Sequence, residues 1–85
     1  MQSSKETALR FVVCVENGEY PAALELHKIY RALPDEVATA DGDLRVIDES
    51  GEDYLYPASY FLPIRLPREA EKALETSFSR LKKTA

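Results

Sequence analysis

The sequence predicts a small, mostly β domain that is closed by a C-terminal helix, and three observations support this prediction. The first is a continuous apolar run over residues 11–15, which is rich in β-branched side chains. The second is a pair of short apolar segments on either side of Ser50-Gly51, which is typical of a β-hairpin. The third is the recurrence of apolar residues at helical spacing after Pro67. A length of 85 residues allows one domain and not two.

The first predicted strand spans residues 9–16 and follows a lead-in over residues 1–8 that we expect to be disordered. The apolar run inside this strand predicts that both of its faces are covered. Asn17-Gly18 then predicts a turn, because both residues readily adopt a left-handed backbone. The strand contains Cys14, the only cysteine, and a single thiol excludes an internal disulfide. Within an apolar run this cysteine is expected to be a small buried side chain.

The segment 22–33 allows two interpretations. The leucines of its first half alternate as in a strand, whereas Ile29 and Leu33 lie on the opposite parity. A bulge near His27-Lys28 reconciles the two halves, and we favour this bulged strand. The alternative is a helix, which would make the fold a generic α+β sheet. The residues that fit a helical period are Ala22, Leu26, Ile29 and Leu33. Residues 34–43 are expected to form a polar loop.

A hairpin is predicted with strands at 44–48 and 53–56, because a glycine-containing connection of four residues joins them. Residues 57–60 are expected to form a single tight helical turn. A last strand is predicted over 61–66, and Pro63 indicates that this strand lies at an edge of the sheet, since proline cannot donate to a ladder.

An amphipathic helix is predicted over residues 67–83, packed on the β domain of residues 9–66. Pro67 suits the first turn because its φ is fixed near the helical value. Glu69 and Glu71 follow in the first turn, as the helix dipole prefers. The predicted apolar face consists of Ala70, Ala73, Leu74, Phe78 and Leu81, and the charged face of Glu69, Glu71, Lys72, Glu75 and Arg80.

The composition argues against several function classes. With 45% hydrophobic and 31% charged residues the chain is expected to fold. A net charge of −4 argues against a nucleic-acid binder, because phosphate neutralisation requires a basic face. The basic cluster Arg80, Lys82 and Lys83 is explained by its place at a helix C-terminus. The polar N-terminus does not resemble a signal peptide, and no window approaches the ~20 apolar residues of a membrane span. We therefore expect a cytoplasmic protein.

Part of the chain, over residues 26–66, resembles a Src-homology-3-like barrel. The segments that carry this likeness are Lys28-Ile29-Tyr30-Arg31-Ala32-Leu33, Leu44-Arg45-Val46-Ile47-Asp48, and Asp53-Tyr54-Leu55-Tyr56-Pro57-Ala58-Ser59-Tyr60-Phe61. In that family a Pro-x-x-Tyr helical turn precedes the final strand, and Pro57-Ala58-Ser59-Tyr60 is similar to it. The resemblance implies a small five-stranded barrel. The Ala-Leu-Tyr-Asp-Tyr strand and the tryptophans of the peptide-binding members are absent, so only Tyr60 corresponds to a groove position.

The chain as a whole also resembles a group of small bacterial proteins of unassigned function. The segment that carries this likeness is Arg45-Val46-Ile47-Asp48-Glu49-Ser50-Gly51-Glu52-Asp53-Tyr54-Leu55-Tyr56-Pro57. The resemblance implies a bacterial source and brings no known activity with it.

Few residues offer candidate chemistry. His27 is the only histidine, and no motif supplies it with the partner base or further ligands that a triad or metal site needs. Four carboxylates surround Ser50-Gly51, but their spacing is not that of a calcium loop. They are Asp48, Glu49, Glu52 and Asp53. A second acidic loop holds Asp35, Glu36, Asp41 and Asp43, and together the two loops would suit a basic protein partner. We expect no catalytic, cofactor or metal site.

The tyrosines are the candidate partner-binding residues. Tyrosine is enriched at interface hot spots because it combines a large apolar ring with a polar tip. Side chains alternate along a strand, so Tyr54 and Tyr56 share a face and would point outward if Leu55 belongs to the core. The alternative is that the C-terminal helix covers them. The predicted set is Tyr30, Tyr54, Tyr56 and Tyr60.

These observations favour a small acidic protein-interaction module without enzymatic activity. The other function classes left open are a nucleic-acid-associated regulator and a small metal-dependent enzyme that uses the acidic hairpin. A homodimer is a further alternative, in which the C-terminal helix packs on its twin.

Overall fold

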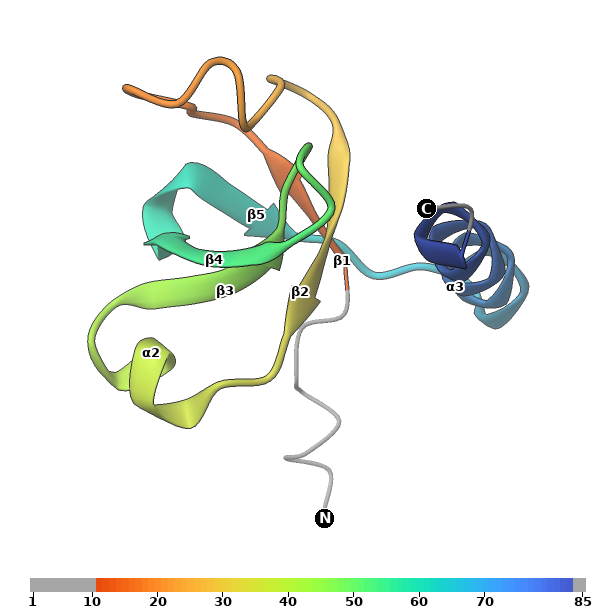
Figure 1. The fold of residues 1–85 in the computed structure, drawn as a ribbon. Helices are drawn as coiled ribbons and strands as arrows, with labels where there is room; N and C mark the ends of the chain where they lie inside the picture. Colours follow the sequence, from red (N-terminus) through yellow and green to blue (C-terminus); the bar gives the residue numbers. More distant parts are fainter. Residues whose placement is uncertain (1–10, 84–85) are drawn as a thin grey trace, which may run out of the picture.

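The structure, a computed structural model, describes residues 11–83 and the side chains of residues 11–79. It is mostly β, with one five-stranded antiparallel sheet and a C-terminal helix (Figure 1). The strands are β1 (Phe11–Cys14), β2 (Ile29–Leu33), β3 (Asp43–Ile47), β4 (Asp53–Pro57) and β5 (Phe61–Pro63). The helices are α2 (Glu36–Ala40), the 3₁₀ turn η1 (Ala58–Tyr60) and α3 (Arg68–Lys83). The lead-in predicted over residues 1–8 lies outside the described residues.

The sheet is open. Its strand order is β4-β3-β2-β1-β5, and among the described strands no ladder joins β4 to β5. The closed barrel is therefore not confirmed, although the chain turns directly from β4 through η1 into β5. The rings of Tyr56 on β4 and Phe61 on β5 lie 6.4 Å apart, so the two edge strands share the core. The sheet is strongly curved around this contact (Figure 1).

The core lies on the inner face of the curved sheet. Cross-strand register places Val12 opposite Tyr30, Ala32 opposite Val46 and Cys14 opposite Phe61, so these side chains share that face. All of them are buried. Leu24, from the loop between β1 and β2, closes the cluster and is fully buried.

The outer face of β1 is also covered, as the continuous apolar run predicts. Phe11 is only 2% exposed, and its ring stacks on Phe78 of α3 with centroids 5.9 Å apart. Helix α3 lies beside the sheet next to β1 and β2 (Figure 1). It begins one residue later than predicted, and Pro67 precedes it.

The interpretation of residues 22–33 is correct only for its second half. Residues 29–33 form β2, but residues 22–28 form turns and irregular backbone, so both the bulged strand and the helix are wrong there. His27 has a φ of 68°, a left-handed conformation that interrupts an extended strand. Two contacts hold the loop instead: the His27 amide donates to the Cys14 carbonyl at 2.7 Å, and Asn17 Nδ2 donates to the Leu24 carbonyl at 3.0 Å.

The predicted polar loop 34–43 contains a helical turn, α2, which the sequence analysis missed. Asp35 is its N-cap and accepts a hydrogen bond from the Ala38 amide at 3.0 Å. Ala38 is buried against the rest of the fold, whereas Val37 is 74% exposed. The signal was the Asp-Glu pair that opens the segment, since a capping aspartate followed by glutamate is typical of a helix start.

The C-terminal part follows the prediction closely. β3 and β4 form the expected hairpin, η1 is the predicted helical turn, and β5 is an edge strand that contains Pro63. The last strand is shorter than the predicted 61–66, because it ends at Pro63. The Ile64 amide still donates to the Phe11 carbonyl at 3.1 Å.

A substitution at Gly18 tests the close packing of Tyr60 on the loop between β1 and β2. Gly18 has a φ of 45°, and an added Cβ would collide with the Tyr60 hydroxyl. We expect Gly18→Ala to lower the free energy of unfolding by about 2–3 kcal/mol in urea denaturation, because the collision adds to the cost of the left-handed backbone. Gly51→Ala is the matched control, because Gly51 has a φ of 86° but open space around it; its cost should be about 1 kcal/mol. Equal losses in the two variants would contradict the packing of Tyr60 on Gly18.

Candidate functional site

The four predicted tyrosines do not form one exposed patch. Tyr30 and Tyr56 are 2% and 5% exposed and belong to the core. The expectation that Tyr54 and Tyr56 both point outward, which required Leu55 in the core, is therefore not met. Tyr54 is 49% exposed, and Tyr60 is half-buried. The register explains the error, because Tyr56 lies opposite Leu44 on the inner face while Leu55 lies on the outer face and is 46% exposed.

Helix α3 is not what covers Tyr56, so the alternative is wrong as well. The rings that pack on Tyr56 are those of Tyr20, at 5.1 Å in an edge-on arrangement, and of Phe61. Tyr20 comes from the loop between β1 and β2. The partner-binding role therefore stays a prediction for the two tyrosines that reach the surface, Tyr54 and Tyr60.

The first carboxylate of the acidic hairpin, Asp48, is a structural group. It is 6% exposed and accepts hydrogen bonds from the Tyr56 hydroxyl at 2.5 Å, the Ser50 hydroxyl at 2.6 Å and the Ser50 amide at 2.8 Å. Burial acts to raise the pKa of Asp48, but these hydrogen bonds outweigh it and hold the pKa below its ordinary value. Burial, followed by the hydrogen bond to Asp48, raises the pKa of Tyr56, so its neutral hydroxyl remains the donor.

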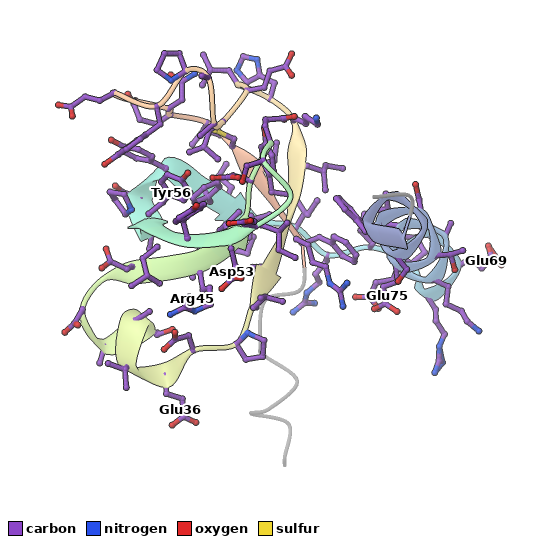
Figure 2. The ribbon with its side chains drawn as sticks, in the orientation of Figure 1. Glu36, Arg45, Asp53, Tyr56, Glu69 and Glu75 are labelled. Atoms are coloured by element: carbon purple, nitrogen blue, oxygen red, sulfur yellow. The ribbon has the colours of Figure 1, made fainter. Side chains whose placement is uncertain are left out.

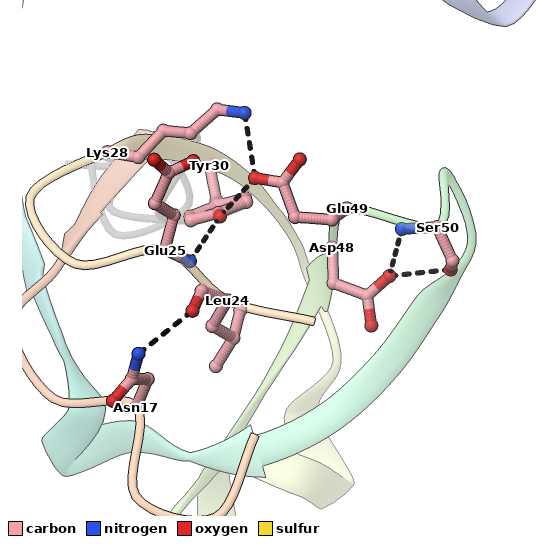
Figure 3. A network of polar contacts seen from close by, with 8 residues as sticks. All are labelled: Asn17, Leu24, Glu25, Lys28, Tyr30, Asp48, Glu49 and Ser50. Carbon is pink, nitrogen blue, oxygen red and sulfur yellow. Dashed lines mark hydrogen bonds and ion pairs between the residues drawn. The ribbon is translucent and has the colours of Figure 1, made fainter. Parts of the chain in front are cut away.

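The second carboxylate, Glu49, joins the hairpin to the loop between β1 and β2 (Figure 3). It accepts from Lys28 Nζ at 2.7 Å and from the Tyr30 hydroxyl at 2.5 Å. The Tyr30 hydroxyl in turn accepts from the Glu25 amide at 2.7 Å. Lys28 first and Tyr30 second lower the pKa of Glu49, since both stabilise its charged form.

The remaining predicted acidic residues include two that bind Arg45. Its guanidinium lies between β4 and α2, where it donates to Asp53 at 2.9 Å and to Asp35 at 2.8 Å (Figure 2). The Ala38 amide first and Arg45 second lower the pKa of Asp35. Four of the predicted acidic side chains thus accept hydrogen bonds from other groups of the protein: Asp35, Asp48, Glu49 and Asp53. Within the part of the chain that the structure describes, no cluster of three or more His, Cys, Asp or Glu is arranged to hold a metal ion.

The remaining candidate residues are His27 and Cys14. His27 is exposed on its turn. Cys14 is fully buried, and burial raises the pKa of its thiol, which disfavours the reactive thiolate. Its Sγ lies 3.3 Å from the Glu16 carbonyl.

An aromatic surface is formed by Tyr60, a predicted partner-binding residue, and by Tyr20, which the sequence analysis missed. Tyr20 is 43% exposed, and the two rings lie 6.4 Å apart. Backbone contacts fix the pair, because the Val15 amide donates to the Tyr60 carbonyl at 2.8 Å and the Leu24 amide donates to the Tyr20 carbonyl at 2.9 Å. The available signal was Tyr20 in a predicted turn region, since loops lie at the surface and tyrosine combines an apolar ring with a polar hydroxyl.

Two exposed carboxylates flank the aromatic surface. Burial, then Tyr20, and then the negative charges of Glu16 and Glu19 raise the pKa of the Tyr60 hydroxyl. Both glutamates lie in the loop that carries Tyr20, and both are exposed. The surface therefore offers two ring faces beside negative charge, which is the chemistry that attracts a cation.

Comparisons of the chain with protein-family models, with curated proteins and with solved structures found no match. The likeness to a bacterial protein group thus stays a prediction. In the described residues, no helix is both long enough and apolar enough to cross a membrane.

Tyr56→Phe isolates the buried hydrogen bond. Loss of the hydroxyl leaves Asp48 buried with fewer donors, so we expect the free energy of unfolding to fall by about 1–3 kcal/mol. Tyr54→Phe is the control, because its hydroxyl donates to Glu52 at 3.3 Å on the surface; its effect should stay within about 0.5 kcal/mol. Urea denaturation at neutral pH measures both variants. A neutral Tyr56→Phe would show that the Asp48–Tyr56 contact contributes nothing.

The contribution of Asp48 to the free energy of unfolding should depend on pH. A carboxylate whose pKa is lowered by folding stabilises the protein above its ordinary pKa of about 4, and this contribution is lost as the pH falls below that value. Wild type should therefore exceed Asp48→Asn in free energy of unfolding at pH near 7, and the gap should narrow in acid. Urea denaturation across this range tests the point, and a gap that does not change with pH would refute it.

Proposed function

We propose that this chain is a small acidic protein-interaction module that binds a cationic segment of a partner protein. The observation that carries the proposal is the aromatic surface of Tyr20 and Tyr60 with Glu16 and Glu19 beside it. A lysine or arginine side chain over a tyrosine ring gains electrostatic attraction, and neighbouring carboxylates add to it. The net charge of −4 favours the approach of such a partner.

We further propose that the fold is a partly open Src-homology-3-like barrel. The strand order β4-β3-β2-β1-β5 and the 3₁₀ turn between β4 and β5 support this proposal, as does the packing of Tyr56 against Phe61. In this arrangement the long loop between β1 and β2 lies beside η1. That neighbourhood brings Tyr20 and Tyr60 together, so the proposed fold and the proposed surface support each other.

The acidic hairpin supports the other function classes less well. A metal-dependent enzyme would need carboxylates that are free to bind the ion, whereas Asp48, Glu49 and Asp53 accept hydrogen bonds from protein donors. A nucleic-acid regulator would need a cationic face. Lys28 and Arg45, two of the described cations near the hairpin, are paired with carboxylates.

Peptide titrations followed by amide NMR shifts test the interaction proposal. Short lysine- and arginine-bearing peptides should shift residues of the loop 15–28 and of η1, and sequence-matched acidic peptides should not. Tyr20→Ala should weaken binding at least about five-fold, because an exposed ring contact contributes roughly 1 kcal/mol. Val37→Ala is the control, since Val37 is an exposed apolar residue on a different element, α2.

Two outcomes would contradict the proposal. Equal loss of binding in Tyr20→Ala and Val37→Ala would mean that the aromatic surface has no special role. Binding of acidic peptides in preference to cationic ones would reverse the charge argument.

A further inference from the structure

Helix α3 is only partly covered by its own sheet. Ala70, Leu74 and Phe78 recur every four residues and share one face, yet each of them is only half-buried. The ring contact between Phe11 and Phe78 joins this face to the sheet. A 16-residue helix is marginal in water unless its apolar face is packed. Further packing against the face of Ala70, Leu74 and Phe78 would therefore stabilise the helix.

A groove lies beside this helix. It is a cavity of about 270 Å³ between Phe78 of α3, the outer face of β2 and the hairpin between β3 and β4. Ile29 and Ile47 provide apolar walls, and both are half-buried. The volume suits one or two apolar side chains of a packed helix better than a typical ligand, whose pockets are ~300–1,000 Å³.

Arg31 is the unmatched charge of the groove. It lies opposite Ile47 in the register and lines the cavity. Its side chain is half-buried, and its guanidinium forms no hydrogen bond or ion pair with the side chains of residues 11–79. Lys28 in the same groove is paired with Glu49. A half-buried guanidinium beside apolar walls favours an occupant that brings both apolar side chains and a carboxylate.

The charges of α3 are separated along its length. Residues 68–75 contain Glu69, Glu71 and Glu75 beside Arg68 and Lys72, a net charge of −1. Residues 76–83 contain Arg80, Lys82 and Lys83, a net charge of +3. Glu69 points away from the sheet (Figure 2). Two copies of this helix placed antiparallel would bring the acidic half of each beside the basic end of the other. Such a pattern is self-complementary, as a two-fold symmetric interface requires.

We propose that α3 and the groove beside it form the interface of a homodimer with antiparallel α3 helices. The acidic half of the partner copy's α3 lies over the groove, where its Ala70 and Leu74 pack against Phe78 and its Glu71 meets Arg31. The helix is about 24 Å long, at 1.5 Å per residue, so the contact extends over several turns. This inference is independent of the proposed function, because η1 and α3 lie on opposite sides of the molecule (Figure 1).

Sedimentation equilibrium of the full chain between about 10 μM and 1 mM tests the dimer. We expect a monomer–dimer equilibrium that salt weakens, because charged pairs contribute to it. Arg31→Glu should raise the dissociation constant about ten-fold or more. Arg65→Glu is the matched control, because Arg65 is an exposed arginine that does not line the groove, and the change in net charge is the same.

Mixing two variants gives the sharper test. Arg31→Glu and Glu71→Lys should each dimerise weakly alone, because each places like charges together at both ends of the symmetric interface. Their equimolar mixture should recover wild-type affinity, because the mixed dimer pairs Glu with Lys at one end and Arg with Glu at the other. A purely intramolecular role for Arg31 would give no recovery on mixing.

The proposal is overturned by any of three results. A chain that remains monomeric up to about 1 mM has no such interface. A dimer that Arg31→Glu and Arg65→Glu weaken equally uses another surface. A mixture that does not recover affinity excludes the Arg31–Glu71 pairing.

Discussion

The hydrogen bond between Tyr56 and Asp48 is the constraint on which the rest of the structure depends. Asp48 follows β3 directly, and its carboxylate also accepts from Ser50, so one buried group closes the hairpin turn and fixes the partner ring on β4. A buried carboxylate without donors would be costly, so β4 must turn its tyrosine inward. Because side chains alternate along a strand, Leu55 then lies on the outer face, and the inner and outer positions of the edge strand β4 are fixed.

The same hairpin holds the loop that carries the aromatic surface. Glu49, the residue after Asp48, accepts from Tyr30, and its amide donates to the Ala23 carbonyl at 3.0 Å. These contacts position the loop 15–28 so that Tyr20 lies against Tyr56. These neighbouring carboxylates thus connect segments that are distant in sequence. Their lowered pKa values follow from donors that also order the fold, which is a structural cause of a perturbed pKa.

Local signals in the sequence predicted the elements that depend on near neighbours. The glycine-containing hairpin, the Pro-x-x-Tyr turn and the period of α3 each lie within a short segment, and each was found. Apart from α2, whose local capping signal was missed, the errors concern residues whose state is set at a distance. The parity of Tyr56 depends on Asp48, the course of residues 22–28 on Cys14 and Asn17, and the place of Tyr20 on η1. The alternation of side chains along a strand divides them between two faces, but it does not tell which of the two faces is buried.

The two candidate surfaces differ in polarity, and therefore in whether they are stable when exposed to water. Tyr20 and Tyr60 carry polar tips and lie beside charged glutamates, so this surface is stable when solvated and can bind and release a partner. The face of α3 has no such tips, and a domain of 85 residues has a small core with little stability in reserve. Covering Ala70, Leu74 and Phe78 would add buried apolar area at α3, where these side chains are only half-buried. An association through α3 would therefore stabilise the fold itself, and the stability of this protein would rise with its concentration.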